Sequence, residues 1–418
     1  MQFSSSSPVM VFGISISNCD EQSKIEKYER EQSTQNYSSS SALNLTYLLL
    51  SPTFGMHQYT ADLANRMSDI HSVSLITTDT YPNDRYSPGI NITTPISTSN
   101  TGFSSEGLKF NSVKRIQETL EELSPELVHI TGPHLWNLMV VRWLRRRDIP
   151  VIHTIHDLDP HRGSRYGRLQ SIWNKLIIGS VDHVLVHGEI YRERLIRAGS
   201  NPDFVTAAPI LHLFIGNESR TKAESMAQTP AYHSQILFFG RLEEYKGINL
   251  LLGAYRLLSA EADHNQMIPS LILAGKGSLS EKSMSNLPPR IDLRDRFIPD
   301  QEALELFQES AIVVFPYVDG TQTALIPSAY YFSKPVISSR VGALTEYVED
   351  GVTGLLVEPD NPKALAESIA GVIFDESRLR TMGTAGREWY DNQQIQEQDK
   401  LAHMYDQVRM NSINAYQQ

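Results

Sequence analysis

A short loop in the second half of the chain combines glycine with two cations. The segment FGRLEEYKG contains Gly240, Arg241 and Lys246 and follows an apolar run of strand length. A glycine at the end of a strand lets a ligand approach the backbone, an arginine offers a bidentate fork and a lysine offers a point charge. This combination suits a diphosphate. Cations that merely meet solvent produce the same pattern, so the segment alone leaves both interpretations open.

A second glycine-flanked cation follows the next apolar run. The segment LILAGKGSL places Lys276 between Gly275 and Gly277. A P-loop needs Ser or Thr directly after its lysine, and Gly277 stands there instead. The three spaced glycines of a dinucleotide fingerprint are also missing from the strand-turn-helix positions. We therefore expect phosphate binding to be distributed over several loops.

A third polar loop, DGTQTALIPS, lies between an apolar run and the apolar segment 329–332. Its members Gly320, Thr321, Gln322 and Thr323 come just before an expected helix, whose first backbone amides are potential donors to a phosphate. Thr321 or Thr323 could instead cap that helix. The two roles are compatible.

Histidines and aspartates gather in the segment HTIHDLDPH. They are His153, His156, Asp157, Asp159 and His161. Because residues 151–155 are expected to be a strand, His156 begins the loop that follows it. The spacing fits no common zinc pattern, so we expect no metal ion here.

Apolar runs of strand length alternate with segments of helical periodicity from residue 45 onward, which is typical of parallel βαβ units. In the first series, strands are expected at 45–50, 73–77, 127–131, 151–155 and 184–187. In the second, they are expected at 236–239, 271–274, 312–315, 335–338 and 355–357. The pattern predicts an α/β protein with two doubly wound parallel-sheet domains that face each other across a cleft.

The domain boundaries are placed by composition. Residues 1–43 are rich in Ser, Gln and Glu, which predicts a mobile extension, although the apolar run 9–16 is a candidate strand. The polar segment 217–232 separates the two series. The two α/β domains are therefore expected at 44–215 and 216–390, and residues 391–418 are expected to form a helix that returns to the first domain.

Composition excludes several classes of protein. The chain has 418 residues, of which 40% are hydrophobic and 20% charged, as in ordinary globular proteins. Its net charge of -11 argues against nucleic acid as a partner. The single cysteine, Cys19, has no partner for a disulfide, and no apolar run approaches the roughly 18 to 20 residues of a membrane-spanning helix. These observations predict a cytoplasmic protein.

One amphipathic segment, WNLMVVRWLRRR at 136–147, carries four arginines near its end. It could contact a membrane at the inner face, next to a lipid-linked acceptor. It could also be an ordinary buried helix whose arginines complement the helix dipole. We favour the second interpretation.

Several of these segments occur together in one known family. Residues 235–373 resemble the donor-binding half of the family-4 retaining glycosyltransferases, which have the GT-B architecture. The similar segments are FGRLEEYKG, LAGKGSL, the turn FPY, SKPVISSRVGALTEYVEDGVTGLLVEPD and the helix near Pro362. The first half is more loosely similar to the acceptor half, through Gly55, VHITGPH and HTIHDLDPH.

This resemblance implies an enzyme that moves a sugar from a nucleotide diphosphate-sugar to a sugar or lipid-linked acceptor with retention, in polysaccharide or glycolipid assembly. Residues 44–215 would bind the acceptor and residues 216–390 the donor. Arg241 and Lys246 would hold the diphosphate, and His156 would lie near the transferred sugar. A diphosphate can leave without a metal ion where fixed cations and helix amides stabilise it, so we expect neither metal nor cofactor.

The expected site follows from these assignments. Its catalytic members are Arg241, Lys246 and His156, and His134 and Asp157 lie on the acceptor side. The donor side comprises Gly55, Gly240, Gly275, Lys276, Gly277, Ile298, Thr321, Gln322, Thr323 and Ser328. The family often has two glutamates in the third loop, where this chain has Gly320 and Ser328. A non-catalytic sugar- or nucleotide-binding protein is therefore the alternative, and a nucleotide-sugar epimerase lacks the extra acids it would need.

Overall fold

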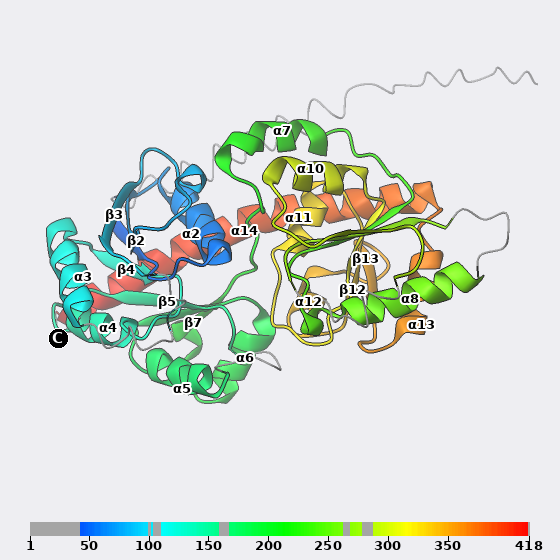
Figure 1. Ribbon diagram of the computed structural model, residues 1–418. Coiled ribbons are helices and arrows are strands. Elements are labelled where there is room, and N and C mark those ends of the chain that lie inside the picture. The colour runs from blue at the N-terminus through cyan, green and yellow to red at the C-terminus, as the bar shows by residue number, and fades with distance from the viewer. Residues whose placement is uncertain are drawn as a thin grey trace, which may run out of the picture. The chain divides into compact units, whose positions relative to one another are not determined.

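The computed structural model describes residues 42–98, 102, 110–158, 167–261, 268–277 and 287–416 (Figure 1). The predicted extension, with its candidate strand at 9–16, lies outside these residues except for Ala42 and Leu43. Residues 43–418 form one compact unit. None of the described helices is long and apolar enough to cross a membrane.

The first sheet has seven parallel strands in the order β3-β2-β1-β4-β5-β6-β7. They are β1 (Asn44–Leu48), β2 (Ser72–Thr78), β3 (Asn91–Ile96), β4 (Leu127–Ile130), β5 (Val151–Ile155), β6 (His183–Val186) and β7 (Val205–Ala207). The central strands β4, β5 and β6 are buried along their whole length, and their sequences are mainly apolar, although each contains a buried histidine. Edge strand β3 is largely half-exposed, and its apolar pattern is too weak to predict a strand.

The second sheet has six parallel strands in the order β10-β9-β8-β11-β12-β13. They are β8 (Gln235–Phe239), β9 (Ser270–Ala274), β10 (Ile291–Arg294), β11 (Ile312–Phe315), β12 (Val336–Ser339) and β13 (Gly354–Val357). In both sheets the strand that comes first in the chain, β1 or β8, lies inside the sheet. The next strands along the chain extend the sheet on one side of it, and the later strands extend it on the other side. The predicted class, two doubly wound parallel α/β domains, is confirmed.

Helices connect the strands on both sides of the sheets. They are α2 (Phe54–Met67), α3 (Phe110–Leu123), α4 (Asn137–Arg145), α5 (Gly167–Ile178), α6 (Glu189–Arg197), α7 (Asn217–Ala227), α8 (Ile248–Glu261), α10 (Asp300–Glu309), α11 (Leu325–Tyr331), α12 (Leu344–Tyr347), α13 (Pro362–Ala370) and α14 (Glu376–Tyr416). The polar segment expected only as a boundary contains α7, whose buried anchors are the small residues Ala223 and Ala227.

Helix α14 is a single long helix that begins at Glu376, before the predicted start at residue 391. Near its first third, Trp389 packs on Tyr330 of α11, with ring centroids 5.5 Å apart. Near its end, the Tyr405 hydroxyl lies 2.9 Å from the Tyr47 hydroxyl of β1 and 2.8 Å from Nδ1 of His129 on β4. The helix therefore contributes to the packing around both sheets.

Candidate active site

Lys246 is a buried cation in the loop after β8. It ends the short 3-10 helix Glu244–Lys246, and only 8% of its surface is exposed. Its Nζ donates to the Tyr317 hydroxyl over 3.0 Å and lies 4.9 Å from the centre of that ring. Among the described residues, no carboxylate forms an ion pair with this ammonium. Buried charges are normally paired, so the position suits an anionic ligand.

Glycines bring the loops after β8 and β9 together. Gly240 and Gly275 have positive φ, and a Cβ on Gly275 would lie 2.0 Å from the Gly240 carbonyl oxygen. A Cβ on Gly240 would lie 3.2 Å from Nζ of Lys246. Gly247 has φ 70°, and a Cβ there would lie 1.7 Å from the Pro316 carbonyl oxygen. Glycine is therefore required for these loops to pack, and the same close approach leaves Lys246 beside bare backbone.

The other two cations predicted for these loops lie at the surface. The Arg241 side chain is 65% exposed and forms an ion pair of 2.6 Å with Glu243. Lys276 is exposed, and the amide of Gly277 donates to Asp295 over 2.9 Å. Of the predicted cations, Lys246 alone is buried.

The third loop meets the acceptor-side segment. The Thr321 hydroxyl donates to the Asp157 carboxylate, and the Thr321 carbonyl accepts from the Tyr191 hydroxyl over 3.1 Å. Oγ1 of Thr323 accepts the amide of Leu325 over 3.2 Å. The N-cap of α11 is Ala324, and no described side chain caps this helix. Gln322 is half-buried between Thr321 and Thr323. The structure thus brings a predicted donor residue and a predicted acceptor residue into contact.

Four predicted residues lie apart from these contacts. Ser328 is fully buried in α11, and its hydroxyl donates to the Ala324 carbonyl over 2.9 Å. Ile298 is 7% exposed. His134 is buried, and its Nδ1 accepts the backbone amide of Trp136 over 3.1 Å. Gly55, the second residue of α2, is exposed, and a Cβ there would have nothing within 4 Å.

His156 directly follows β5 and pairs with a histidine that the sequence had not indicated. Its Nε2 lies 2.8 Å from the Thr131 carbonyl oxygen, and its Nδ1 lies 3.1 Å from Nε2 of His187, which follows β6. Nδ1 of His187 lies 3.2 Å from the Ala208 carbonyl oxygen. Burial lowers the pKa of both histidines. His187 could have been found, because β5 and β6 pair Ile155 with Val186, and the next residue of each strand is histidine.

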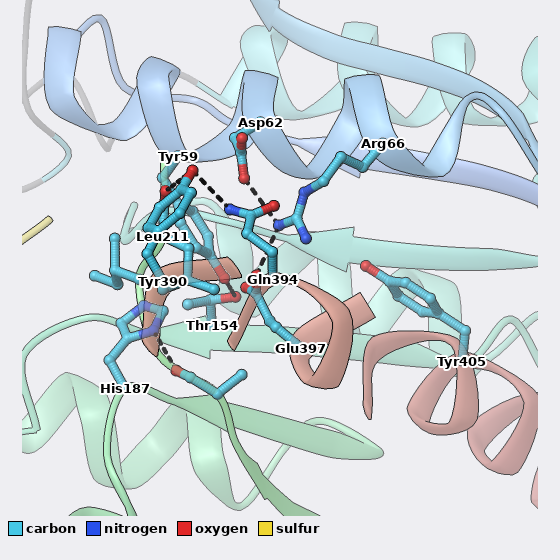
Figure 2. Close-up of polar contacts among 12 residues, drawn as sticks. Tyr59, Asp62, Arg66, Thr154, His187, Leu211, Tyr390, Gln394, Glu397 and Tyr405 are labelled. Carbon is cyan, nitrogen blue, oxygen red and sulfur yellow. Dashed lines mark hydrogen bonds and ion pairs between the residues drawn. The ribbon is translucent and has the colours of Figure 1, made fainter. Parts of the chain in front are cut away.

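A buried polar network lies next to this pair (Figure 2). Nη2 of Arg66 lies 2.8 Å from Asp62 and 3.0 Å from Glu397 of α14. Glu397 is 2% exposed, and burial, only partly offset by Arg66, raises its pKa to about 7. The Tyr59 hydroxyl lies 3.3 Å from Oγ1 of Thr154. The ring of Tyr59 also meets His187 edge-on, with centroids 5.1 Å apart.

Within the described part of the chain, no group of three or more His, Cys, Asp or Glu side chains is arranged to hold a metal ion. Two members of the histidine and aspartate segment, Asp159 and His161, lie outside the described residues. His153 is buried, and its Nδ1 lies 2.8 Å from the Thr154 carbonyl oxygen.

Two protein families and several known proteins are similar to this chain in sequence or structure. The family described as Glycosyl transferases group 1 matches residues 233–375, and Glycosyltransferase Family 4 matches residues 55–209. A D-inositol 3-phosphate glycosyltransferase from Corynebacterium diphtheriae is 26% identical over 279 residues, 61% of this chain and 65% of the relative, so less than two thirds of that protein is matched. A D-inositol 3-phosphate glycosyltransferase 2 from Catenulispora acidiphila is 26% identical over 366 residues, 79% of this chain and 84% of that one.

A solved structure shows the same fold. The crystal structure of Anabaena HepE in complex with UDP and glucose superposes with a TM-score of 0.64 at 16% identity, over 87% of this chain and 99% of the other. The two family matches together cover more than half of the chain. The chain therefore contains a Glycosyl transferases group 1 type domain and a Glycosyltransferase Family 4 type domain, on a GT-B fold.

Proposed function

We propose that this protein transfers a glycosyl group from a nucleoside diphosphate-sugar to an acceptor, with retention of the anomeric configuration and without a metal ion or other cofactor. The observation that carries the proposal is Lys246, a buried ammonium whose described partner is a neutral hydroxyl. A diphosphate bound beside Gly240 would provide the missing negative charge. As the sugar leaves, charge grows on that diphosphate, and a fixed cation stabilises it without reorganisation.

The relatives support the donor class. HepE is described in complex with UDP and glucose, and the Corynebacterium relative is named for glycosyl transfer to an inositol phosphate. We extend the donor class to this chain. The acceptor is proposed to be a sugar or a lipid-linked sugar, in the assembly of a polysaccharide or glycolipid.

The test is a donor screen followed by a turnover assay. UDP-, GDP- and ADP-sugars are first compared by thermal shift, since a ligand that binds only the folded state raises the melting temperature. Release of free nucleoside diphosphate is then measured with candidate acceptors, in EDTA and in magnesium. Equal rates in both and an unchanged anomeric configuration by NMR are expected. Loss of activity in EDTA with recovery in magnesium or manganese would overturn the metal-independent mechanism.

Gly320 and Ser328 favour a second candidate, a protein that binds a nucleotide-sugar without transferring it. The family resemblance implies glutamates at these two positions, and neither Gly320 nor Ser328 has a carboxylate. Such a protein would show the thermal shift but release no nucleoside diphosphate with any acceptor. The same pair of measurements therefore separates the two functions.

We also propose that α4 and α5 contact an anionic membrane surface. Neither helix contains an acidic residue, although the chain carries a net charge of -11. On one face of α5, Leu169, Ile172 and Leu176 are 44%, 58% and 54% exposed, and Lys175 lies beside them. Apolar side chains next to cations suit the headgroup region of anionic lipids.

Vesicle sedimentation tests this contact. Binding to vesicles with anionic phosphatidylglycerol should exceed binding to pure phosphatidylcholine, and it should fall with salt. Ile172→Glu should abolish binding to the anionic vesicles. Ile395→Glu on α14 is the control and should not abolish it, because Ile395, at 50% exposure, is similarly exposed but lies outside the proposed surface. Equal binding by both variants would overturn the proposed surface.

A further inference from the structure

Four ring nitrogens lie in a row between two backbone carbonyls at the carboxyl ends of β4 to β7. The row begins at the Thr131 carbonyl, passes through His156 and His187, and ends at the Ala208 carbonyl. Its three contacts measure 2.8, 3.1 and 3.2 Å, each within hydrogen-bonding distance. Both rings are buried, with His156 9% and His187 1% exposed.

The hydrogens in this row can be counted. A carbonyl oxygen only accepts, so Nε2 of His156 and Nδ1 of His187 must each carry a hydrogen. The two nitrogens that face each other across 3.1 Å then need one more hydrogen between them. Two neutral imidazoles carry two hydrogens in total, but the three contacts need three. With one proton missing, two lone pairs face each other inside the protein.

We propose that His156 and His187 bind one proton between their rings and act together as a single cation, with His187 as a positioning residue for His156. The four nitrogens and two carbonyls then satisfy one another completely. Neither ring can take up a second proton without breaking its bond to the other. The pair is therefore a one-proton site.

The surroundings determine when this proton is held. The ring of Tyr59 on α2 packs nearly perpendicular to both histidine rings, at centroid distances of 4.8 and 5.1 Å. Burial lowers the pKa of both rings, and a charge on His156, followed by His212 and His129, lowers that of His187 further. Asp157 raises the pKa of His156, and a charge on His156 in turn lowers the pKa of His153. The free protein should thus lose the proton at a pH below the ordinary histidine value of 6.5.

A bound anion would raise the affinity of the histidine pair for its proton. Asp157, the residue after His156, contacts Thr321 of the third loop, so the pair lies next to the segment expected to hold the donor. The role of the pair rests on the proposed function. The donor diphosphate raises the proton affinity of the pair, and the resulting cation stabilises the leaving group. The charged form is present at low pH and is lost as pH rises through the pKa of the pair.

NMR of protein labelled with ¹⁵N-histidine tests the proton count without any assay of transfer. In the free protein, the ring signals of His156 and His187 should move together at one midpoint, with one proton taken up by the two rings. Addition of UDP should raise that midpoint. His187→Gln cannot titrate, and its amide can satisfy Nδ1 of His156 in either form, by donating from its NH2 group or accepting at its oxygen. The common midpoint should therefore be lost, and His156 should titrate as a single ring at a different pH. His183→Gln, on the same strand, is the control and should leave the common midpoint unchanged.

Two separate midpoints, or rings that stay neutral down to pH 5 with and without UDP, would overturn the proposal. Where transfer is measurable, kcat/KM of the wild type should fall as pH rises through the midpoint, and in His187→Gln that decline should move to the new midpoint of His156. A shared titration in a protein that transfers no sugar would leave the proton site standing and remove the proposed function. Failure of the two ideas is therefore distinguishable.

Discussion

Lys246 in the second sheet and His156 in the first each follow a parallel strand, yet their polar surroundings are opposite. Lys246 has a tyrosine hydroxyl and no described carboxylate, so its charge lacks a counter-charge. His156 has a partner at both ring nitrogens, and its charge depends on one shared proton. The first arrangement suits a permanent cation that binds an anion. The second suits a group whose charge responds to that anion.

The largest effect is expected from Lys246→Met. Turnover should fall by about two to three orders of magnitude, the scale of losing one fixed electrostatic stabiliser. The free energy of unfolding should not fall, because the variant removes a buried charge that has no counter-charge among the described residues. Turnover and urea denaturation measure the two quantities.

Lys334 provides the matched comparison for that variant. It is also buried, but its Nζ donates to the carbonyls of Ala231 and Gln308, the second over 2.8 Å. Lys334→Met should therefore lower the free energy of unfolding by about 1 to 3 kcal/mol, the effect of leaving buried acceptors without a donor. Near wild-type turnover in a folded Lys246→Met protein would remove Lys246 from the donor site.

Glu397 extends the comparison to a buried acid. Its pKa is raised to about 7 in the folded protein, against an ordinary value of 4.5. The folded state therefore binds this proton more tightly, and stability should fall as pH rises from about 4.5 to 7, by up to about 3 kcal/mol. Glu397→Gln should remove this part of the pH dependence in urea denaturation. The exposed Glu388→Gln should retain it, and a similar loss in both variants would contradict the assignment.

Arg241 tests whether burial is what makes a cation effective. Because its side chain is 65% exposed and paired with Glu243, water screens its charge. Arg241→Ala should lower kcat/KM by about tenfold, which corresponds to about 1.4 kcal/mol. A loss as large as that of Lys246→Met would show that Arg241 leaves Glu243 and joins the diphosphate when the donor binds.

Gly55 distinguishes a glycine needed by a ligand from one needed by the fold. A methyl group there would contact nothing within 4 Å, so Gly55→Ala should stabilise helix α2 by about 0.5 to 1 kcal/mol. If the donor phosphates approach this position, the same variant should bind the donor several-fold more weakly. Gly89→Ala, which also has open space, should leave donor affinity unchanged. Unchanged affinity in Gly55→Ala would remove this glycine from the donor site.

The smallest effect is expected at Ser328. Its hydroxyl donates within its own helix, so it has little capacity left to hold a ribose. Ser328→Ala should change donor affinity by less than about tenfold, since a neutral hydrogen bond contributes about 0.5 to 1.5 kcal/mol. Turnover should change even less. A hundredfold loss of turnover would give Ser328 a direct role in catalysis.

The buried strands were predictable because a parallel strand covered on both faces is mainly apolar, as in β11, whose sequence is IVVF. The edge strands β3 and β10 were missed because half-exposed strands lose that pattern. Helix α7 was missed because alanines, not large residues, anchor it.

Within the site, local sequence identified which residues have the right chemistry but not which of them are buried. Arg241 and Lys246 lie five positions apart, but only Lys246 is covered, by Tyr317 from 71 residues further along the chain. The His187 partner of His156 likewise comes from 31 residues away. Contacts between residues so far apart in the chain depend on which strands are neighbours in the sheet. They can be predicted only once the strand order is known.

Helix α14 has a consequence for the order in which the protein matures during synthesis. Strand β1 leaves the ribosome early, but its Tyr47 bonds to Tyr405, which lies 358 residues further along the chain. Leu401 and Met404 of the same helix belong to the same buried apolar cluster as Tyr47. Nδ1 of His129 also bonds to the Tyr405 hydroxyl, so it has no such partner before α14 is made. Domains usually fold as units from the N-terminus during translation. In this chain, the first sheet must carry an uncovered apolar surface, and the Tyr47 hydroxyl and Nδ1 of His129 must lack their Tyr405 partner, until α14 emerges.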